Sequence, residues 1–212
     1  MDITIRRERA DDYRTVEELT RMAFWNMVEP GCCEHYLVHV MRSHADFCGD
    51  LDFVAECDGK IVGSILYTRS FLAGRDGKKL EIRTFGPLSV LPEYQRKSVG
   101  SKLIEHTVEL VRAQGYPAVA IFGNPSNYAG SGFKSCREYN VRYTDGKYPT
   151  SLLMLPLRED VLLENEWTYL ESNVFYFDSN ESEKFDRDFC PMEKKITPEQ
   201  EVFEILSRSF VE

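Results

Sequence analysis

Hydrophobic and polar positions alternate in some segments of the chain and recur every three or four residues in others, a pattern typical of mixed α/β proteins. Alternating or continuously apolar segments predict strands at 3–7, 53–57, 60–70, 80–90, 117–122, 133–139 and 150–157. Helical spacing predicts a helix from Asp11-Asp12 to about Phe24, helices at about 34–43 and 99–114, and one helical turn around Tyr128. This order of elements predicts a mixed sheet with helices on its faces.

Two dipeptides add detail to the predicted sheet. Asp58-Gly59 separates two strand-like runs and is typical of a tight hairpin turn, so the flanking strands should pair antiparallel. Gly86-Pro87 interrupts the strand predicted at 80–90. Because proline has no N–H to donate to a ladder, we expect a bulge or a break at this point.

The last quarter of the chain differs in composition from the rest. Of the 212 residues, those from 158 onward include 15 acidic and 6 basic ones, which accounts for the whole formal net charge of -9. This part also holds an aromatic, strand-like run at 167–178 and a capping box, Thr197 to Gln200, ahead of a helix reaching about Phe210. We therefore predict a domain at 1–157 and an acidic, aromatic-rich C-terminal extension at 158–212 that packs on it.

Composition argues against several other classes of protein. No apolar run is long enough to span a bilayer and no apolar signal segment opens the sequence, so we predict a soluble, cytoplasmic protein without a membrane partner. The six cysteines lack C-x-x-C spacing, which predicts reduced thiols and no metal site. The acidic balance gives no overall basic surface for nucleic acid.

The stretch from Phe85 to Leu103 carries the most informative pattern. It joins the strand with the Gly-Pro break to a helix through a turn of small and polar residues. Unpaired N–H groups at such a helix start can bind a pyrophosphate, Gly100 permits close approach, and Arg96 and Lys97 add positive charge. A helix start that binds nothing is the alternative, and composition alone does not decide between them.

This stretch resembles the acetyl-CoA signature of the GNAT superfamily of N-acetyltransferases, Q/R-x-x-G-x-G/A, with Gln95 to Gly100 in register. A second GNAT feature, Y-x-x-x-G-F, occurs as Tyr128 to Phe133. The likeness covers about residues 3–157 and implies a mostly antiparallel central sheet flanked by helices, followed here by a C-terminal strand and helix extension. One departure is Ser98, which replaces the first glycine of the signature and puts a side chain where backbone and pyrophosphate usually meet.

The resemblance also implies roles for individual residues. Those that it places at acetyl-CoA are Leu88, Ser89, Val90, Gln95, Arg96, Lys97, Ser98, Val99, Gly100, Ser101 and Asn124. The strand at 88–90 would hydrogen-bond the pantetheine arm like an added strand, and the Gly86-Pro87 break would free an amide for the thioester oxygen. Tyr128 would protonate the departing thiolate, with a role in packing alone as the alternative.

The general base is not specified by the sequence. Glu81, Glu34, Glu29 and His35 lie on or near elements that border the acceptor site in this fold, and a water molecule relayed by backbone groups is a further alternative. The tract EPGCCEHY, residues 29–36, lies between the two N-terminal helices, where GNAT enzymes vary. We therefore expect contacts with the acceptor there.

Two functions are compatible with these features. The first is an N-acetyltransferase that transfers an acetyl group from acetyl-CoA directly to a primary amine of a small molecule or peptide, in a ternary complex and without a metal. The second is a non-catalytic acyl-CoA-binding module, for which Ser98 and the unassigned base would be the signs. A P-loop NTPase is excluded because no G-x-x-x-x-G-K-[ST] sequence occurs. Three roles stay open for the extension: a lid over the acceptor pocket, a surface that pairs two subunits in a homodimer, or a stabilising appendage.

Overall fold

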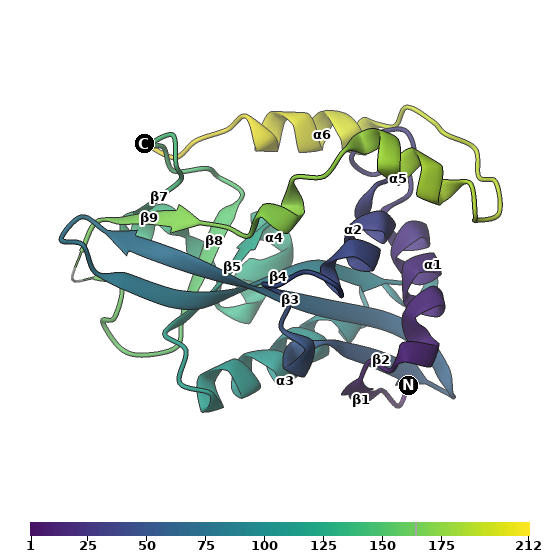
Figure 1. The fold of residues 1–212 in the computed structure, drawn as a ribbon, viewed down its shortest axis with the longest axis horizontal. Helices are drawn as coiled ribbons and strands as arrows, with labels where there is room; N and C mark the ends of the chain where they lie inside the picture. Colours follow the sequence, from purple (N-terminus) through teal and green to yellow (C-terminus); the bar gives the residue numbers. More distant parts are fainter. Residues whose placement is uncertain (164) are drawn as a thin grey trace.

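The computed structural model describes residues 1–163 and 165–212, which build a twisted mixed sheet with helices on both faces (Figure 1). The sheet has the order β1-β2-β3-β4-β5-β8-β6, and β9 pairs with β3 and β7. The strands are β1 (Thr4–Arg7), β2 (Phe53–Cys57), β3 (Lys60–Gly74), β4 (Lys79–Val90), β5 (Ala118–Phe122), β6 (Lys134–Ser135), β7 (Val141–Arg142), β8 (Leu152–Pro156) and β9 (Trp167–Leu170). Only the β4–β5 and β7–β9 pairs are parallel among the pairs of described strands, which confirms the predicted mixed, mostly antiparallel sheet.

The helices are α1 (Tyr13–Phe24), α2 (Glu34–Met41), α3 (Val99–Ala113), α4 (Pro125–Tyr128), α5 (Ser179–Asp186) and α6 (Pro198–Ser207). Helices α1 and α3 cover opposite faces of the sheet. The Tyr67 hydroxyl of β3 hydrogen-bonds to Thr107 of α3, 2.8 Å, whereas Ser89 of β4 donates to Thr20 of α1, 3.0 Å. The register of β3 and β4 puts Tyr67 and Ser89 on opposite faces, because side chains alternate along a strand.

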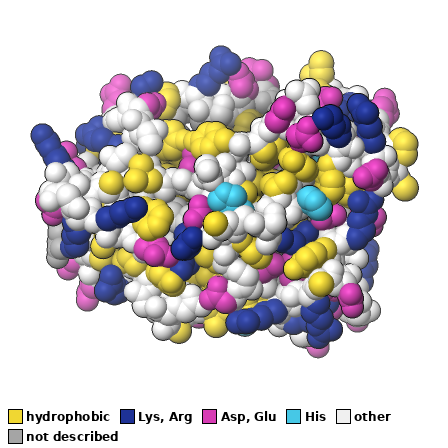
Figure 2. Space-filling model, viewed as in Figure 1, with side chains coloured by type: hydrophobic (Ala, Val, Ile, Leu, Met, Phe, Trp, Pro, Cys, Tyr) yellow, Lys and Arg dark blue, Asp and Glu magenta, His cyan; other side chains and the backbone are white. Residues whose placement is uncertain are grey.

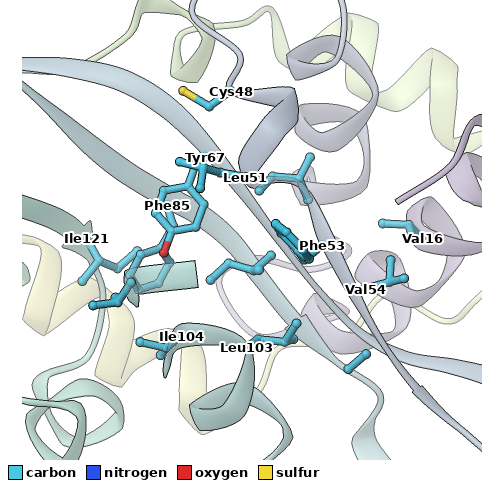
Figure 3. Close-up of a cluster of buried hydrophobic side chains, with 14 of the residues drawn as sticks. Val16, Cys48, Leu51, Phe53, Val54, Tyr67, Phe85, Leu103, Ile104 and Ile121 are labelled. Carbon is cyan, nitrogen blue, oxygen red and sulfur yellow. The ribbon is translucent and has the colours of Figure 1, made fainter. Parts of the chain in front are cut away.

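Strand β3 runs through the centre of the core. Its residues 61–68 are all buried, since helices cover the strand on both faces. On the α3 face, Tyr67 and Phe85 pack with Leu103 and Ile121 (Figure 3). This packing holds β4, β5 and α3 together at the place where the candidate site is built.

Two segments differ from the sequence prediction. The strand predicted at 133–139 is wrong beyond Lys134–Ser135, because the Ser135 hydroxyl accepts a hydrogen bond from the Arg137 N–H and starts a 3-10 turn instead. The run 167–178 is strand only in β9. The Asp178 side chain then caps α5, a helix that the hydrophobic pattern did not indicate.

The segment after β8 lies along β3, α1 and α2. β9 pairs antiparallel with the end of β3, and the Arg21 guanidinium of α1 binds Asp186 at the end of α5, 2.6 Å, and the Cys190 carbonyl, 3.0 Å. Helix α6 has the predicted capping box at Thr197. Hydrogen bonds hold the chain on both sides of this helix: the Thr197 hydroxyl donates to the Asn26 carbonyl, and the Val211 N–H donates to the Tyr148 carbonyl. None of the residues of α6 is buried.

The described residues form neither a membrane span nor a cluster of metal ligands. None of their helices has the length and apolar character that crossing a bilayer requires. Nowhere in 1–163 or 165–212 do three or more His, Cys, Asp or Glu side chains converge on a point where they could hold a metal ion. All six cysteines are free thiols.

Candidate active site

The candidate site begins where β4 and β5 separate. These parallel strands pair only through Arg83 with Val119 and Thr84 with Ala120. Each strand continues beyond this pairing, so a split opens between them, which we call the β4–β5 split. The bulge predicted at Gly86-Pro87 is present at this point. It is seen in the pairing of β4 with β3, whose register shifts between Ile65 and Tyr67.

Beyond the split, no strand of the described residues pairs with one edge of β4. The Leu91 N–H donates to the Val62 carbonyl of β3, 3.0 Å. Since the ladder groups of an antiparallel strand alternate in direction, the N–H and C=O groups of Leu88 and Val90 point away from β3, toward the split. The Gln95 side chain donates to the Val90 carbonyl, 3.1 Å. An extended ligand that carries amide groups can pair with such an edge.

The start of α3 lies beside this edge. The first intrahelical hydrogen bond runs from the Lys102 N–H to the Ser98 carbonyl, 3.0 Å, so the three preceding N–H groups, of Val99, Gly100 and Ser101, have no partner in the helix. A Cβ atom on Gly100 would lie 3.6 Å from the Leu88 side chain, which shows how closely helix and strand approach. Orphan N–H groups and the helix dipole together favour an anion here.

The turn before α3 has an unusual backbone. Arg96 and Ser98 both adopt positive φ, 57° and 63°. Ser98 therefore keeps the left-handed conformation that glycine takes without strain, and its hydroxyl makes no capping hydrogen bond. The side chains of Arg96 and Lys97 are exposed and add positive charge at the helix start. Ser89 contributes only backbone to this region, because its hydroxyl points to α1.

Tyr128 stands on the other side of the split, at the end of α4. The Asn124 side chain accepts hydrogen bonds from the Ser126 N–H, 3.0 Å, and the Ser126 hydroxyl, 2.9 Å, and thereby orients the helical turn. The Tyr128 ring packs edge-on against Phe85, with centroids 5.7 Å apart. Burial raises the pKa of the Tyr128 phenol to about 12. The ring is so close to β5 that a Cβ atom on Gly123 would come within 2.4 Å of it.

The four candidate bases lie in different environments. His35 is fully buried against the rings of Phe185 and Phe189, and burial lowers its pKa to about 4, so it is part of the packing under α5. Glu81 accepts a hydrogen bond from the Arg83 guanidinium, 2.7 Å. Glu29 is exposed in the loop before α2. Glu34 is largely enclosed but keeps some solvent contact, and burial raises its pKa to about 7.

The pattern of the sequence did not reveal a group of hydroxyls on the α1 face of the split. The Thr84 hydroxyl hydrogen-bonds to Ser70, 2.6 Å, and to the Tyr169 hydroxyl, 2.7 Å, and all three residues are buried. Tyr169 comes from β9, and only the pairing of β9 with β3 brings it to Thr84. Thr84 is the last residue of β4 that pairs with β5. The one available signal was the alternation of Trp167 and Tyr169 in an aromatic run.

The outer surface gives less information about the site. Figure 2 shows acidic and basic side chains interspersed on the face viewed, with no broad area of one sign. One surface hollow of about 350 Å³ is formed by residues 155–163 with Arg112 and Tyr139. Another of about 370 Å³ is formed by residues 146–148 and 210–212 with Arg137 and Arg142. Neither includes Leu88, Gly100 or Tyr128.

Comparison with known sequences identifies one family. The model of the acetyltransferase (GNAT) family matches residues 17–133, more than half of the 212-residue chain. The uncharacterized N-acetyltransferase YjhQ of Escherichia coli K12 is 37% identical over 86 residues, which are 41% of this chain and 47% of that protein. The chain thus spans about half the length of the curated relative that it matches.

Comparison with solved structures gives the same fold. The GNAT family N-acetyltransferase YhbS of Escherichia coli, solved in complex with CoA, superposes with a TM-score of 0.71 at 22% identity, over 82% of this chain and 92% of that one. A GNAT family acetyltransferase of Brucella melitensis, solved in complex with acetyl-CoA, superposes with a TM-score of 0.64 at 23% identity, over 82% and 98%. At such identities the likeness establishes the fold.

Proposed function

Because the chain belongs to the GNAT acetyltransferase family, we propose that it is an N-acetyltransferase that transfers an acetyl group from acetyl-CoA to a primary amine of a small molecule or peptide. The observation that carries this proposal is the β4–β5 split. It brings the free edge at Leu88 and Val90, the uncapped start of α3 and the Tyr128 phenol to one place.

The donor would lie along these groups. The N–H groups of Val99, Gly100 and Ser101 would bind the pyrophosphate, with Arg96 and Lys97 beside it. The pantetheine amides would pair with the exposed edge of β4. Two proteins of the same fold were solved with CoA and with acetyl-CoA, which supports acetyl-CoA as the donor.

Transfer would occur at the bulge. The amine nitrogen attacks the thioester carbon, the carbon–sulfur bond breaks, the nitrogen loses a proton to a base and the thiolate gains one from Tyr128. Because burial keeps the pKa of Tyr128 near 12, this phenol stays protonated at neutral pH and can donate. Holding both reactants in one ternary complex lowers the barrier to transfer, because their translational and rotational entropy is lost on binding and not in the chemical step.

Glu34 is the base that we favour among the four candidates. With a pKa of about 7, its carboxyl can take up a proton and release it again near neutral pH, as base catalysis requires. It lies at the first position of α2, within the 29–36 tract for which we propose contacts with the acceptor. His35, by contrast, is enclosed by α5.

A calorimetric titration with acetyl-CoA, followed by a thiol-release assay against polyamines, amino acids, aminoglycosides and peptides, tests the proposal. An acyltransferase binds acetyl-CoA and releases CoA thiol faster when the right amine is added. Binding without release would favour the non-catalytic acyl-CoA-binding module. Absence of binding would refute both functions.

A further inference from the structure

A carboxylate and two phenols form a compact cluster where the C-terminal extension meets the sheet. The Tyr143 hydroxyl and the Tyr176 hydroxyl both donate to Oε1 of Glu171, each at 2.5 Å, and the two hydroxyl oxygens are 2.6 Å apart. We call these three residues the Glu171 cluster. Tyr143 follows β7, whereas Glu171 and Tyr176 belong to the extension after β9. Neither the hydrophobic pattern nor the GNAT motifs point to any of the three.

The Glu171 cluster lies next to the β4–β5 split. The Tyr143 ring packs edge-on against Phe122, the last residue of β5, with centroids 5.7 Å apart. Phe122 in turn packs against Tyr169, with ring centroids 5.8 Å apart. The Tyr169 hydroxyl hydrogen-bonds to Thr84, where β4 and β5 begin to separate. The cluster is therefore one layer of aromatic rings away from the place where β4 and β5 separate. Figure 1 shows the chain leaving β9 close to the end of β5.

Among the described residues, the carboxylate of Glu171 accepts hydrogen bonds from phenols alone. In the part of the chain that the structure describes, no Lys, Arg or His forms an ion pair with it, and its Oε2 accepts no hydrogen bond there. A carboxylate has lone pairs for about four hydrogen bonds. Glu171 is only partly buried and Tyr176 is 67% exposed, so a ligand can reach the free oxygen from solvent.

Aromatic rings around a carboxylate select for a positive charge. Tyrosine ring faces attract ammonium groups, and a carboxylate within the same cluster adds a charge-assisted hydrogen bond. An anionic group would gain neither interaction, and a neutral donor would gain the hydrogen bond to the carboxylate without the attraction of a positive charge to the rings and to Glu171. Burial and then the hydrogen bond to Glu171 raise the pKa of Tyr143, and the hydrogen bond to Glu171 raises the pKa of Tyr176, so both phenols stay protonated as donors.

We propose that Glu171, Tyr143 and Tyr176 bind an ammonium group of the acceptor, other than the amine that reacts, so that the enzyme prefers diamines or polyamines. The reacting amine belongs in the split, and the ring of Phe122 separates the split from the Glu171 cluster. The acceptor therefore carries two positive charges separated by a short apolar chain. This inference rests on the proposed transferase function.

Two matched acceptors and two matched variants test the inference. 1,5-Diaminopentane and 5-amino-1-pentanol share chain length and reacting amine but differ in the second charge. Glu171→Gln removes the carboxylate charge and keeps the shape, and Glu183→Gln removes one charge from an exposed position of α5. Each protein is titrated with each amine in the presence of CoA, and kcat/KM is measured with acetyl-CoA.

We expect the wild-type protein and Glu183→Gln to bind the diamine about tenfold more tightly than the aminoalcohol, and Glu171→Gln to lose this preference. Acetyl-CoA affinity and Tm should stay unchanged in Glu171→Gln. Equal binding of the two amines by the wild-type protein, or a preference that survives in Glu171→Gln, would overturn the inference. So would a fall in Tm of Glu171→Gln with the preference intact, which is the result of a merely structural role.

Failure of the proposed function gives a different result. If no amine accelerates thiol release, the transferase assignment fails, yet the direct titrations still measure whether the Glu171 cluster binds a second ammonium. Diamine binding that depends on Glu171 would then support the site, and its absence would overturn it.

Discussion

Ser98 is the residue at which this chain departs most from the GNAT signature, and the structure shows what the departure involves. Its φ of 63° is left-handed, a conformation that costs a side-chain-bearing residue about 1–2 kcal/mol relative to its right-handed form. Its hydroxyl makes no capping hydrogen bond that would offset this cost. The serine thus occupies a glycine conformation at the start of α3, beside the N–H groups proposed to bind the pyrophosphate.

Ser98→Gly should raise both stability and donor affinity. Relief of the left-handed conformation outweighs the greater freedom of glycine in the unfolded chain, so we expect the free energy of unfolding to rise by about 0.5 kcal/mol. Acetyl-CoA should bind more tightly because the backbone can approach it more closely. Chemical denaturation and calorimetric titration measure the two effects. Ser101→Gly, within α3, is the control and should destabilise, since glycine is unfavourable in a helix.

Gly123→Ala should impair turnover more than stability. Its Cβ would come within 2.4 Å of the Tyr128 ring, which must then move away from the end of β5. Displacing a catalytic group by about 1 Å can reduce turnover by about a hundredfold. Gly130→Ala is the control, because nothing lies within 4 Å of its added Cβ. If thiol release by the two variants is the same, Tyr128 has no role that depends on its position.

At the scale of elements, a buried network of charges joins β1, α1 and α2. The Arg42 guanidinium, which follows α2, binds Glu8 at 2.7 Å and Glu17 of α1 at 2.9 Å, and its side chain is 6% exposed. Asp52, just before β2, lies beside Glu8 and is also buried. Burial, and then the hydrogen bond with Glu8, raise the pKa of Asp52 far above its ordinary value. The network therefore holds a proton at neutral pH.

Asp52→Asn should flatten the dependence of stability on pH. A carboxyl group with a raised folded-state pKa stabilises most fully below its unfolded-state pKa, and this contribution is lost as the pH rises toward the folded-state value. We therefore expect the free energy of unfolding of the wild-type protein to fall between pH 5 and pH 8, and that of Asp52→Asn to fall less. Urea denaturation at several pH values in this range measures the free energy of unfolding of both proteins. Asp50→Asn, at an exposed neighbour, should keep the wild-type slope, and an unchanged slope in Asp52→Asn would contradict the role of this carboxyl.

Elements were predictable from the sequence where local chemistry decides them. The Asp58-Gly59 turn, the bulge at Gly86-Pro87 and the capping box at Thr197 all form as predicted, because each depends on the conformational preferences of a few adjacent residues. The segment 133–139 did not follow its pattern, since the Ser135 hydroxyl competes for backbone N–H groups. Helix α5 has a weak apolar face and packs on α2 through Phe185, which contacts the rings of His35 and Tyr36.

At the scale of the whole molecule, β9 joins the extension to the sheet, and buried polar contacts hold the part of the extension that follows β9. The Arg21 side chain is 5% exposed and forms two hydrogen bonds with Asp186. Phe189 packs against both Arg14 and Arg21. These contacts fix the end of α5, from which the chain continues to α6 (Figure 1).

Asp186→Asn should loosen the extension. It leaves the buried charge of Arg21 without its counter-charge, which typically costs about 3 kcal/mol. Trypsin should then cleave the extension faster at Lys184 and Arg187, as followed by mass spectrometry. Glu181→Gln is the matched control. It breaks only the exposed bridge to Lys184, 2.6 Å, and should leave stability nearly unchanged because solvent screens such a pair. Equal cleavage of both variants would show that the Arg21–Asp186 pair does not anchor the extension.

The sequence by itself determined the family, the mixed sheet and the segment proposed to hold the donor, because Gln95–Gly100 and Tyr128–Phe133 are short motifs whose backbone roles are local. Only the tertiary structure decided which side chains stand beside the split. Thr84, Phe122, Tyr143 and Glu171 are distant in sequence and have no common spacing, and they meet because β9 pairs with β3 and β7. Long-range strand pairing has no local signal in a single sequence, so the Glu171 cluster could not be predicted from it, unlike the acceptor contacts proposed at 29–36.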